Sequence, residues 1–308
     1  MINKPITLTK SQGKFLDQAE KIRTENPIER DQVGFSTRMF VQCSLPHSDP
    51  GNDLPAWTRT NGNVCLSIQP KRYAKDGELN CIGYPYGNIP RLILFYVCTK
   101  AIQTKSKCVP LGNSLSSFLH TLDQEVTGGR WGTIHRFKDQ FRRLFTANID
   151  FTYEAESETF DLKANLASRV HLWWDTKQPE QFNLFNSYIE LTEEFINELW
   201  AYPVPVDMGI VGAIKQSPLA LDLYTWLTYR VVSIHKPTRI SWLSIAGQVG
   251  AEYTNLKEVA RYSKEALRKI CALWPDLKIE EVKGGIILHP SKPSIPTLQF
   301  SVSSPSRK

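Results

Sequence analysis

The sequence repeats one order of elements, and this repeat constrains the fold more than any single motif. In the first half, the spacing of apolar residues predicts a helix starting at Pro90, a short helix capped by Ser114 and a long helix over 133–149. Two strand-like stretches, 151–153 and 160–174, follow the long helix, and the second contains a break. The predicted order of the first half is therefore helix, short helix, long helix and hairpin.

The second half shows the same order at a near-constant offset, although the residues themselves barely match. Its predicted elements are a helix opened by Ser217-Pro218, a short helix capped by Ser241, a long helix over 255–273, and strands over 278–281 and 285–289 around Lys283-Gly284. This is the element order of a winged helix, whose third helix enters the major groove of DNA while the hairpin follows the backbone. Many small α+β domains share the order, but finding it twice strengthens the interpretation.

We therefore predict an α+β fold of tandem winged-helix domains, that is, two helix–helix–helix–hairpin units with an N-terminal extension. The predicted domains are an N-terminal helix and extension over 1–60, a first winged helix over 61–178 and a second over 179–308. Within the extension, spacing predicts a helix over 11–24 and a strand over 33–42. A segment over 46–63 is rich in Pro, Gly, Asn and Asp and is predicted as a loop.

Composition narrows the class of protein. The 308 residues include 8 Trp, 11 Tyr and 14 Phe, which a disordered chain would not carry. The apolar runs are far shorter than a bilayer span, and the N-terminus lacks the apolar region of a secretory signal. We expect a soluble cytoplasmic protein with no membrane contact. The six cysteines lack close pairs, so we interpret Cys43, His47, Cys65 and Cys81 as structural residues rather than a zinc site.

Charge is distributed in blocks. Residues 1–150 hold 20 Lys or Arg against 13 Asp or Glu, residues 151–200 hold 3 against 10, and residues 201–308 hold 14 against 8. Two basic blocks therefore flank an acidic one, a pattern typical of a protein with two surfaces for an anionic partner. Chance scatter of surface charge would give the same totals. Whether the basic residues lie together on helix faces therefore decides between a binding surface and chance scatter.

The long helix of the second half carries four cations at spacings of 4, 3 and 4, namely Lys257, Arg261, Lys264 and Arg268. They align opposite the apolar stripe, on a face about 16 Å long at 1.5 Å per residue. Like charges repel there, and a merely solvated helix would interleave acids. We predict a DNA-facing surface with Lys283 in the adjacent wing; a solvated surface is the alternative.

The long helix of the first half is more mixed. Its predicted DNA contacts, together with one arginine in the preceding glycine turn, are Arg130, Arg136, Lys138, Gln140, Arg142 and Arg143. The alternative is an interdomain or dimer surface that faces the acidic segment 154–161. We expect the second half to supply most base readout and the first half to supply backbone contacts.

Enzyme signatures are missing. The sequence lacks a phosphate-binding G-x-x-x-x-G-K-[ST] loop and the closely spaced histidine pair of nicking enzymes. Tyr224 and Tyr229 lie in an apolar helix, and the carboxylates Asp207, Asp222 and Glu193-Glu194 fit helix ends and surface positions. We therefore predict no catalytic residues, no metal and no cofactor.

Six multi-residue blocks occur in order along the chain: Phe40-Val-Gln-Cys-Ser-Leu-Pro-His47, Gly83-Tyr-Pro-Tyr-Gly-Asn-Ile-Pro-Arg-Leu92, Leu111-Gly-Asn-Ser-Leu-Ser-Ser-Phe118, Thr127-Gly-Gly-Arg-Trp-Gly132, Asp139-Gln-Phe-Arg-Arg-Leu-Phe145 and Ser217-Pro-Leu-Ala-Leu-Asp-Leu-Tyr-Thr-Trp-Leu-Thr-Tyr-Arg230. These blocks resemble the RepA-type plasmid-encoded replication initiators, and the similarity spans about residues 35–290. The last block is also similar to one in TrfA-type initiators. Thr99-Lys100-Ala101 is a small departure from the family pattern.

The resemblance implies an initiator that binds repeated sites, called iterons, in double-stranded DNA at a plasmid origin. It further implies opening of adjacent DNA and recruitment of a host initiator and helicase. Some related initiators repress their own promoter as dimers, so a homodimer is a further candidate partner. A winged-helix transcriptional repressor without replication activity is the runner-up, and an origin-nicking enzyme is third.

Overall fold

The computed structural model describes residues 9–122, 124–129, 132–155, 158–163, 165–172, 187–249 and 255–296. Its elements up to the acidic block are α1 (Lys10–Thr24), β1 (Val33–Thr37), α2 (Arg38–Gln42), β2 (Trp57–Asn61), β3 (Val64–Gln69), β4 (Arg72–Lys75), β5 (Glu78–Cys81), α3 (Asn88–Thr104), β6 (Cys108–Gly112), α4 (Leu115–Thr121), α5 (Thr133–Thr146), β7 (Asn148–Ala155) and β8 (Glu158–Lys163). The later elements are β9 (Ala167–His171), β10 (Ser187–Leu191), α6 (Glu193–Ala201), β11 (Pro203–Asp207), α7 (Met208–Ile214), α8 (Pro218–Val231), β12 (Thr238–Ser241), α9 (Trp242–Val249), α10 (Leu256–Leu273), β13 (Ile279–Val282) and β14 (Gly285–Leu288). The predicted α+β class is confirmed, with several small antiparallel sheets.

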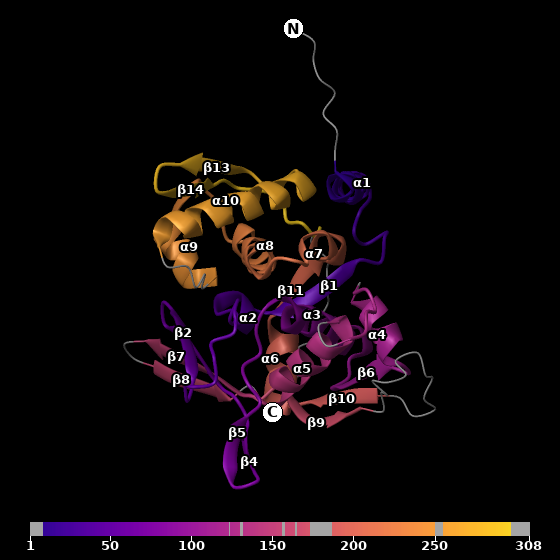
Figure 1. Ribbon diagram of the computed structural model, residues 1–308. Coiled ribbons are helices and arrows are strands. Elements are labelled where there is room, and N and C mark those ends of the chain that lie inside the picture. The colour runs from indigo at the N-terminus through magenta and orange to yellow at the C-terminus, as the bar shows by residue number, and fades with distance from the viewer. Residues whose placement is uncertain are drawn as a thin grey trace, which may run out of the picture.

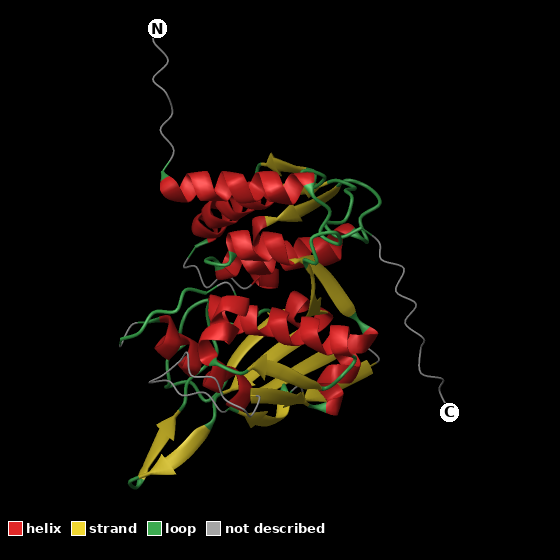
Figure 2. Ribbon diagram, turned by 90° about the vertical axis from the view of Figure 1, so that its right-hand side faces the viewer, coloured by secondary structure: helices red, strands yellow, loops and turns green. Residues whose placement is uncertain are grey.

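These elements form two lobes (Figures 1 and 2). The upper lobe of Figure 1 contains α1, α7 to α10 and the sheet β12-β14-β13, and the lower lobe contains α3 to α6 and β2 to β10. Strands β1 and β11 pair where the lobes meet, and α2 contacts both β1 and α8. Within the described ranges, no helix is long and apolar enough to cross a bilayer.

The lobes cut across the order of the chain. Helix α1 belongs to the predicted extension but packs against α7 and α10 in the upper lobe. Strand β10 and helix α6 belong to the predicted second domain but contact β6 and α3 in the lower lobe. The lobes are defined by which elements pack together. The domain boundaries predicted from the sequence concern which segments fold independently, and they stay a prediction.

The upper lobe contains the second predicted unit, in the order α8, β12, α9, α10, β13 and β14. Side-chain caps start two of its helices: Ser217 Oγ accepts a hydrogen bond from Ala220 N at 3.2 Å, and Asn255 Oδ1 accepts one from Glu258 N at 3.0 Å. Strand β14 pairs with both β12 and β13, so the hairpin and the strand before α9 form one sheet. Gly284 turns the hairpin with a φ of +84°, which a glycine adopts without strain.

The lower lobe contains the first predicted unit, in the order α3, β6, α4, α5, β7 and β8. Here the strand after the first helix does not join the hairpin. Strand β6 pairs with β10, while β7 and β8 extend a separate sheet of order β2-β3-β7-β8. The two units therefore share their order of elements but differ in how the hairpin is attached.

Two local predictions are corrected. The strand predicted over 33–42 ends at Thr37, whose Oγ1 accepts a hydrogen bond from Phe40 N and caps the short helix α2. The predicted loop 46–63 contains β2, which pairs with the unpredicted strand β3. The break expected within 160–174 is present, since this stretch contains two strands, β8 and β9; residues 173 and 174 lie outside the described ranges.

A buried ionic cluster joins the lobes. Arg91 of α3 donates from Nε and Nη2 to the two carboxylate oxygens of Asp222 of α8, each at 2.7 Å. His47 Nε2 lies 2.7 Å from Asp222 Oδ2, and Arg91 also donates to the carbonyl of Leu45 at 2.6 Å. The side chains of Arg91, Asp222 and His47 are 5%, 10% and 11% exposed. The fork of the arginine thus fixes one helix of each lobe relative to the other.

The cluster changes the protonation of its members. Burial lowers the pKa of His47 although its bond to Asp222 opposes this shift. Burial alone would raise the pKa of Asp222, but Arg91 and His47 hold this pKa well below its ordinary value. Asp222 is therefore the anionic centre of the cluster.

A second ion pair lies close to the β1–β11 pair. Arg30 Nη2 is 2.8 Å from Asp207 Oδ2, and both side chains are buried. Tyr224 of α8 accepts a hydrogen bond from Asp207 N at 2.8 Å and lies within hydrogen-bond distance, 3.1 Å, of Ser294 Oγ. The end of β11 is therefore held both by the segment after α1 and by α8.

Candidate nucleic-acid interface

Helix α10 buries one stripe and exposes the opposite one. The buried stripe consists of Val259, Ser263, Ala266, Leu267, Ile270 and Leu273. The predicted cations Lys257, Arg261 and Arg268 are exposed, and Lys264 is 36% exposed at the edge of the same face. The structure therefore brings together the four cations that the sequence placed on this helix face.

The N-terminal half of this face is open. Among the described residues, none forms an ion pair with Lys257 or Arg261. The guanidinium of Arg261 lies 3.8 Å from the centroid of the Tyr262 ring, a cation–π contact that restricts its motion. The Arg261 guanidinium is therefore positioned at the surface, where its N–H groups can donate hydrogen bonds to a ligand.

The C-terminal half of the face is occupied by a carboxylate from the hairpin. Glu281 of β13 lies 3.1 Å from Lys264 Nζ through Oε2 and 3.2 Å from Arg268 Nη2 through Oε1. The hydrogen bond from Lys264 is the main cause of a lowered pKa at Glu281, and Arg268 adds to it. Lys264 also lies 5.8 Å from the centroid of the Trp242 ring. Sequence reasoning missed Glu281, since its contact with α10 depends on how the hairpin packs.

The hairpin turn adds two cations beside α10. Lys283 is exposed at the turn, and its carbonyl accepts a hydrogen bond from Arg239 Nη2 at 2.8 Å. Arg239 is an exposed residue of β12 that the sequence analysis did not select. The only signal for it was a basic cluster, Lys236 and Arg239, just before the capping Ser241.

Helix α5 divides the predicted residues of the first half into two groups. Arg136, Lys138 and Arg142 are exposed, as a DNA-facing surface requires. The guanidinium of Arg142 lies 5.8 Å from the Tyr73 ring of β4, at the base of the hairpin that projects from the lower lobe in Figure 1. Arg130 lies outside the described residues.

Gln140 and Arg143 face inward, which contradicts their prediction as surface contacts. Gln140 is 5% exposed, and its Oε1 accepts a hydrogen bond from Tyr86 N at 2.9 Å. Arg143 is 16% exposed at its side chain and pairs with Asp49 at 3.2 Å and Asp139 at 2.9 Å. The loop before α3 packs against this side of α5. The residues whose spacing suggested one outward face therefore lie at the boundary between the surface and the core.

Glycine permits this packing. Gly83 has a φ of +95°, and an added Cβ there would come within 2.7 Å of the Arg143 guanidinium. Arg143 Nη1 also donates to the carbonyl of Tyr84 at 3.2 Å. Arg143 therefore connects α5 to the loop before α3.

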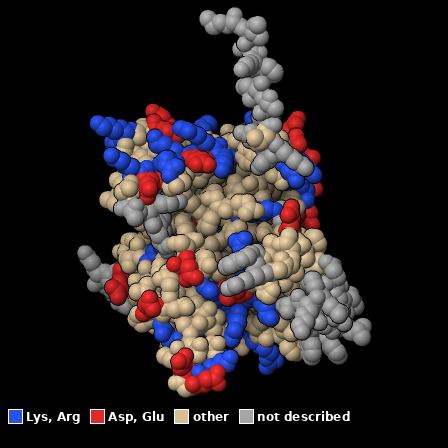
Figure 3. Space-filling model, in the orientation of Figure 1, with Lys and Arg blue, Asp and Glu red and all other residues tan. Residues whose placement is uncertain are grey.

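The two hairpins differ in charge. The sequence of strands β7 and β8 contains Asp150, Glu154, Glu158 and Asp161 against Lys163, while the second hairpin contains Glu280 and Glu281 between Lys278 and Lys283. Figure 3 shows basic side chains gathered at the upper left of the molecule, where Figure 1 draws α10, β13 and β14, with a few acidic ones among them. The α10 face with the second hairpin is therefore the better candidate for an anionic partner.

Two of the four residues considered for metal binding, Cys43 and His47, have other partners. Cys43 Sγ lies within hydrogen-bond distance of the Arg59 and Val64 carbonyls, and burial raises the pKa of Cys43 to about 11. His47 belongs to the Asp222 cluster. Across the described ranges, no group of three His, Cys, Asp or Glu side chains is placed to hold a metal ion.

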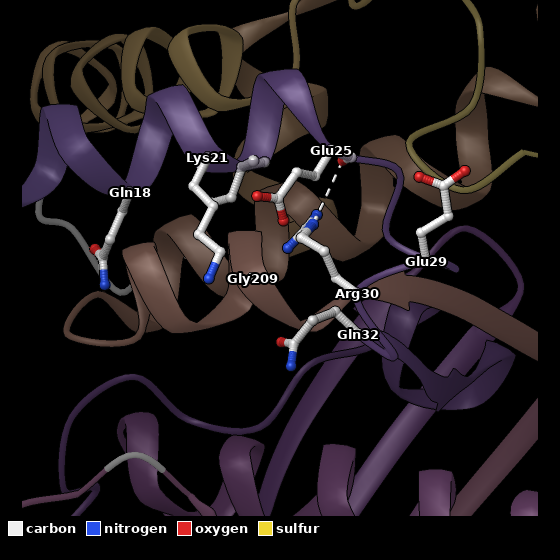
Figure 4. Close-up of a pocket in the computed structure, with 8 residues that line it drawn as sticks. Gln18, Lys21, Glu25, Glu29, Arg30, Gln32 and Gly209 are labelled. Atoms are coloured by element: carbon white, nitrogen blue, oxygen red, sulfur yellow. Dashed lines mark hydrogen bonds between the residues drawn. The ribbon is translucent and has the colours of Figure 1, made fainter.

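A cavity of about 520 Å³ lies between α1, the segment that follows it and α7 (Figure 4). Its charged lining residues are Lys21, Arg30, Glu25 and Glu29, so positive and negative charges balance. Arg30 donates from Nε to the Glu25 carbonyl at 3.4 Å, the contact drawn as a dashed line, besides its pair with Asp207. The cavity therefore belongs to the packing of α1 and offers no net charge to an anionic substrate.

Together, the α+β fold and the cationic helix beside a hairpin define a candidate nucleic-acid-binding protein. The family model described as plasmid encoded RepA protein matches residues 84–243, and the chain belongs to this family. This match confirms the resemblance to the RepA-type initiators over these residues. The match runs from the start of the first unit into α9, so α10 and the β13–β14 hairpin lie outside it.

Two solved structures are similar to the chain. Both contain domains 2 and 3 of RctB, one as a selenomethionine derivative, and each is 11% identical in sequence. They cover 82% of this chain with TM-scores of 0.48 and 0.49, and 98% and 96% of their own chains are matched. The comparison with curated proteins finds no match.

Proposed function

We propose that the protein is a plasmid replication initiator that binds repeated sites in double-stranded DNA at its origin. Membership of the RepA family supports the plasmid role. The observation that carries DNA binding is the exposed cationic face of α10 next to the β13–β14 turn. Double-stranded DNA is a dense polyanion, and proteins bind it through several phosphate contacts from Lys and Arg.

In this proposal the upper-lobe unit is a winged helix whose third helix, α10, enters the major groove. Arg261 contacts base edges, Lys257 contacts phosphate, and Lys283 with Arg239 follows the backbone beside the groove. The lower-lobe unit is the second winged helix and supplies backbone contacts through Arg136, Lys138 and Arg142. Its acidic hairpin disfavours a wing contact with phosphate.

The remaining parts of the proposal rest on the family. The protein acts in the cytoplasm, helps to open DNA next to the repeats, and recruits a host initiator and helicase. Autorepression by a homodimer is compatible with the same DNA-binding surface. A transcriptional repressor without replication activity would use this surface equally well, so only a replication assay separates the two functions.

The separating experiment is a maintenance assay in a host that receives the gene and its flanking DNA on a plasmid without another origin. We expect stable maintenance with the wild-type gene and loss when Lys257, Arg261 and Arg268 are all replaced by Ala. Repression of a reporter joined to the flanking DNA, together with failure to maintain the plasmid, would support the repressor instead.

We further predict that the protein works by binding rather than by turnover. The buried Tyr224 already accepts a hydrogen bond from Asp207 N, and burial raises its pKa, so this hydroxyl is a poor nucleophile. Purified protein with Mg²⁺ is expected to leave ATP intact and supercoiled origin DNA unnicked. The measurement is release of phosphate and conversion of supercoiled to open-circular DNA on a gel. A covalent adduct between any Tyr and DNA would contradict the non-enzymatic mechanism.

A further inference from the structure

Glu281 contacts both predicted DNA-binding cations at the C-terminal half of the α10 face. Each of its two carboxylate oxygens contacts a different cation, Lys264 at 3.1 Å and Arg268 at 3.2 Å. A phosphate group offers a similar pair of anionic oxygens to the same donors. Within the part of the chain that the structure describes, the α10 face therefore carries two cations paired with Glu281 and two without an ion pair.

Resting on the proposed function, we propose that Glu281 is an intramolecular competitor of DNA phosphate that weakens binding to every DNA sequence. The carboxylate must release Lys264 and Arg268 before these two cations can contact phosphate. This requirement reduces the electrostatic binding that dominates non-specific association with DNA.

The geometry favours competition over a purely structural role. Glu281 is 36% exposed and Arg268 is 73% exposed, so their contact is an accessible ion pair of the kind that contributes little to stability. The hairpin is held independently by the β13–β14 ladder and by the pairing of β14 with β12. The pKa of Glu281 is lowered, so this side chain is ionised near neutral pH. A competitor of phosphate must carry this negative charge.

The test compares wild-type protein with Glu281→Gln, which keeps the shape and removes the charge. Affinity is measured by fluorescence anisotropy for a short random-sequence duplex and for a duplex from DNA flanking the gene. We expect Glu281→Gln to bind both duplexes about 2- to 30-fold more tightly, the range that two exposed ion pairs represent. The plot of log K against log salt should become steeper by about 0.9 for each released cation.

Two further variants make the result specific. Glu265→Gln removes an equivalent charge from the i,i+4 pair with Lys269 on the flank of α10 and is expected to change neither affinity nor salt dependence. In a chain that also carries Lys264→Ala and Arg268→Ala, Glu281→Gln is expected to add no affinity. A gain that persists there would overturn the proposal, because Glu281 would then act on other groups.

The sign of the effect separates the outcomes. A structural role for Glu281 predicts weaker binding and a lower melting temperature in Glu281→Gln, and unchanged or weaker binding of both duplexes overturns the inference. Wild-type protein that binds neither duplex overturns the proposed function and this inference with it. Tighter binding with a steeper salt dependence supports both.

Discussion

Replacing Asp222 by Asn is expected to lower the free energy of unfolding by about 3–5 kcal/mol, the usual cost of removing one partner from a buried ion pair. The amide keeps the shape of the side chain but leaves the guanidinium of Arg91, 5% exposed, without its counter-charge. Because Arg91 and Asp222 lie on helices of different lobes, the loss affects the contact between the lobes directly. The measurement is chemical denaturation of the full chain, followed by tryptophan fluorescence.

Asp76→Asn is the matched control. Asp76 is exposed at the β4–β5 turn with a φ of +55°, a conformation that Asn tolerates. Its expected change is within about 0.5 kcal/mol, as for most surface positions. A loss at Asp222 no larger than this would show that the cluster does not hold the lobes together.

The same cluster fixes the sign of the pH dependence. Both His47 and Asp222 have a pKa below the ordinary value, so the unfolded chain binds protons more readily than the folded one. The contribution of the two groups to the free energy of unfolding is therefore complete above pH 6.5, the ordinary pKa of His47. This contribution decreases as the pH falls below 6.5 and decreases further below 3.8, the ordinary pKa of Asp222. The step at the lower pH should disappear in Asp222→Asn.

Replacing Arg261 by Ala is expected to reduce discrimination between the repeat and random DNA by about 1–3 kcal/mol, the value of one bidentate contact with guanine. Arg261 has the largest expected effect on the α10 face because its guanidinium is exposed, oriented by Tyr262 and not engaged by Glu281. The measurement is the ratio of dissociation constants for the two duplexes at one fixed salt concentration.

Lys269→Ala is the control for charge, since it removes one cation from the same helix but from its flank, where Lys269 pairs with Glu265. Its ratio of dissociation constants is expected to equal that of the wild type. Lys257→Ala should weaken binding to both duplexes equally and reduce the salt slope by about 1, as expected for a phosphate contact. A wild-type ratio in Arg261→Ala would remove this residue from base readout.

The face of α10 could be predicted from the sequence because it depends on local rules. The apolar stripe, the cap at Asn255 and the cation spacing all act within one helix, and the structure follows them. The residues predicted to form one exposed face of α5 have the same helical spacing, yet Gln140 and Arg143 are buried or nearly so. The loop before α3 packs against both side chains. The prediction of an exposed face failed because this contact joins segments that are distant in sequence.

Other parts of the site also depend on long-range packing. Glu281 contacts α10 because β13 pairs with β14, and Arg239 reaches the turn because β12 pairs with the other edge of β14. The Asp222 cluster joins residues from three distant segments. No periodic pattern marks such contacts, whereas the RepA-type blocks were recognisable because several residues match in order.

The most direct test of the central claim compares two face variants of the full chain by footprinting on DNA that flanks the gene. One variant removes the α10 face through Lys257→Ala and Arg261→Ala, and the other removes the α5 face through Arg136→Ala, Lys138→Ala and Arg142→Ala. We predict that wild-type protein protects regularly repeated sites, that the α5 variant protects the same sites more weakly, and that the α10 variant loses the repeated pattern. Loss of the pattern in the α5 variant, with its retention in the α10 variant, would contradict the assignment of base readout to α10.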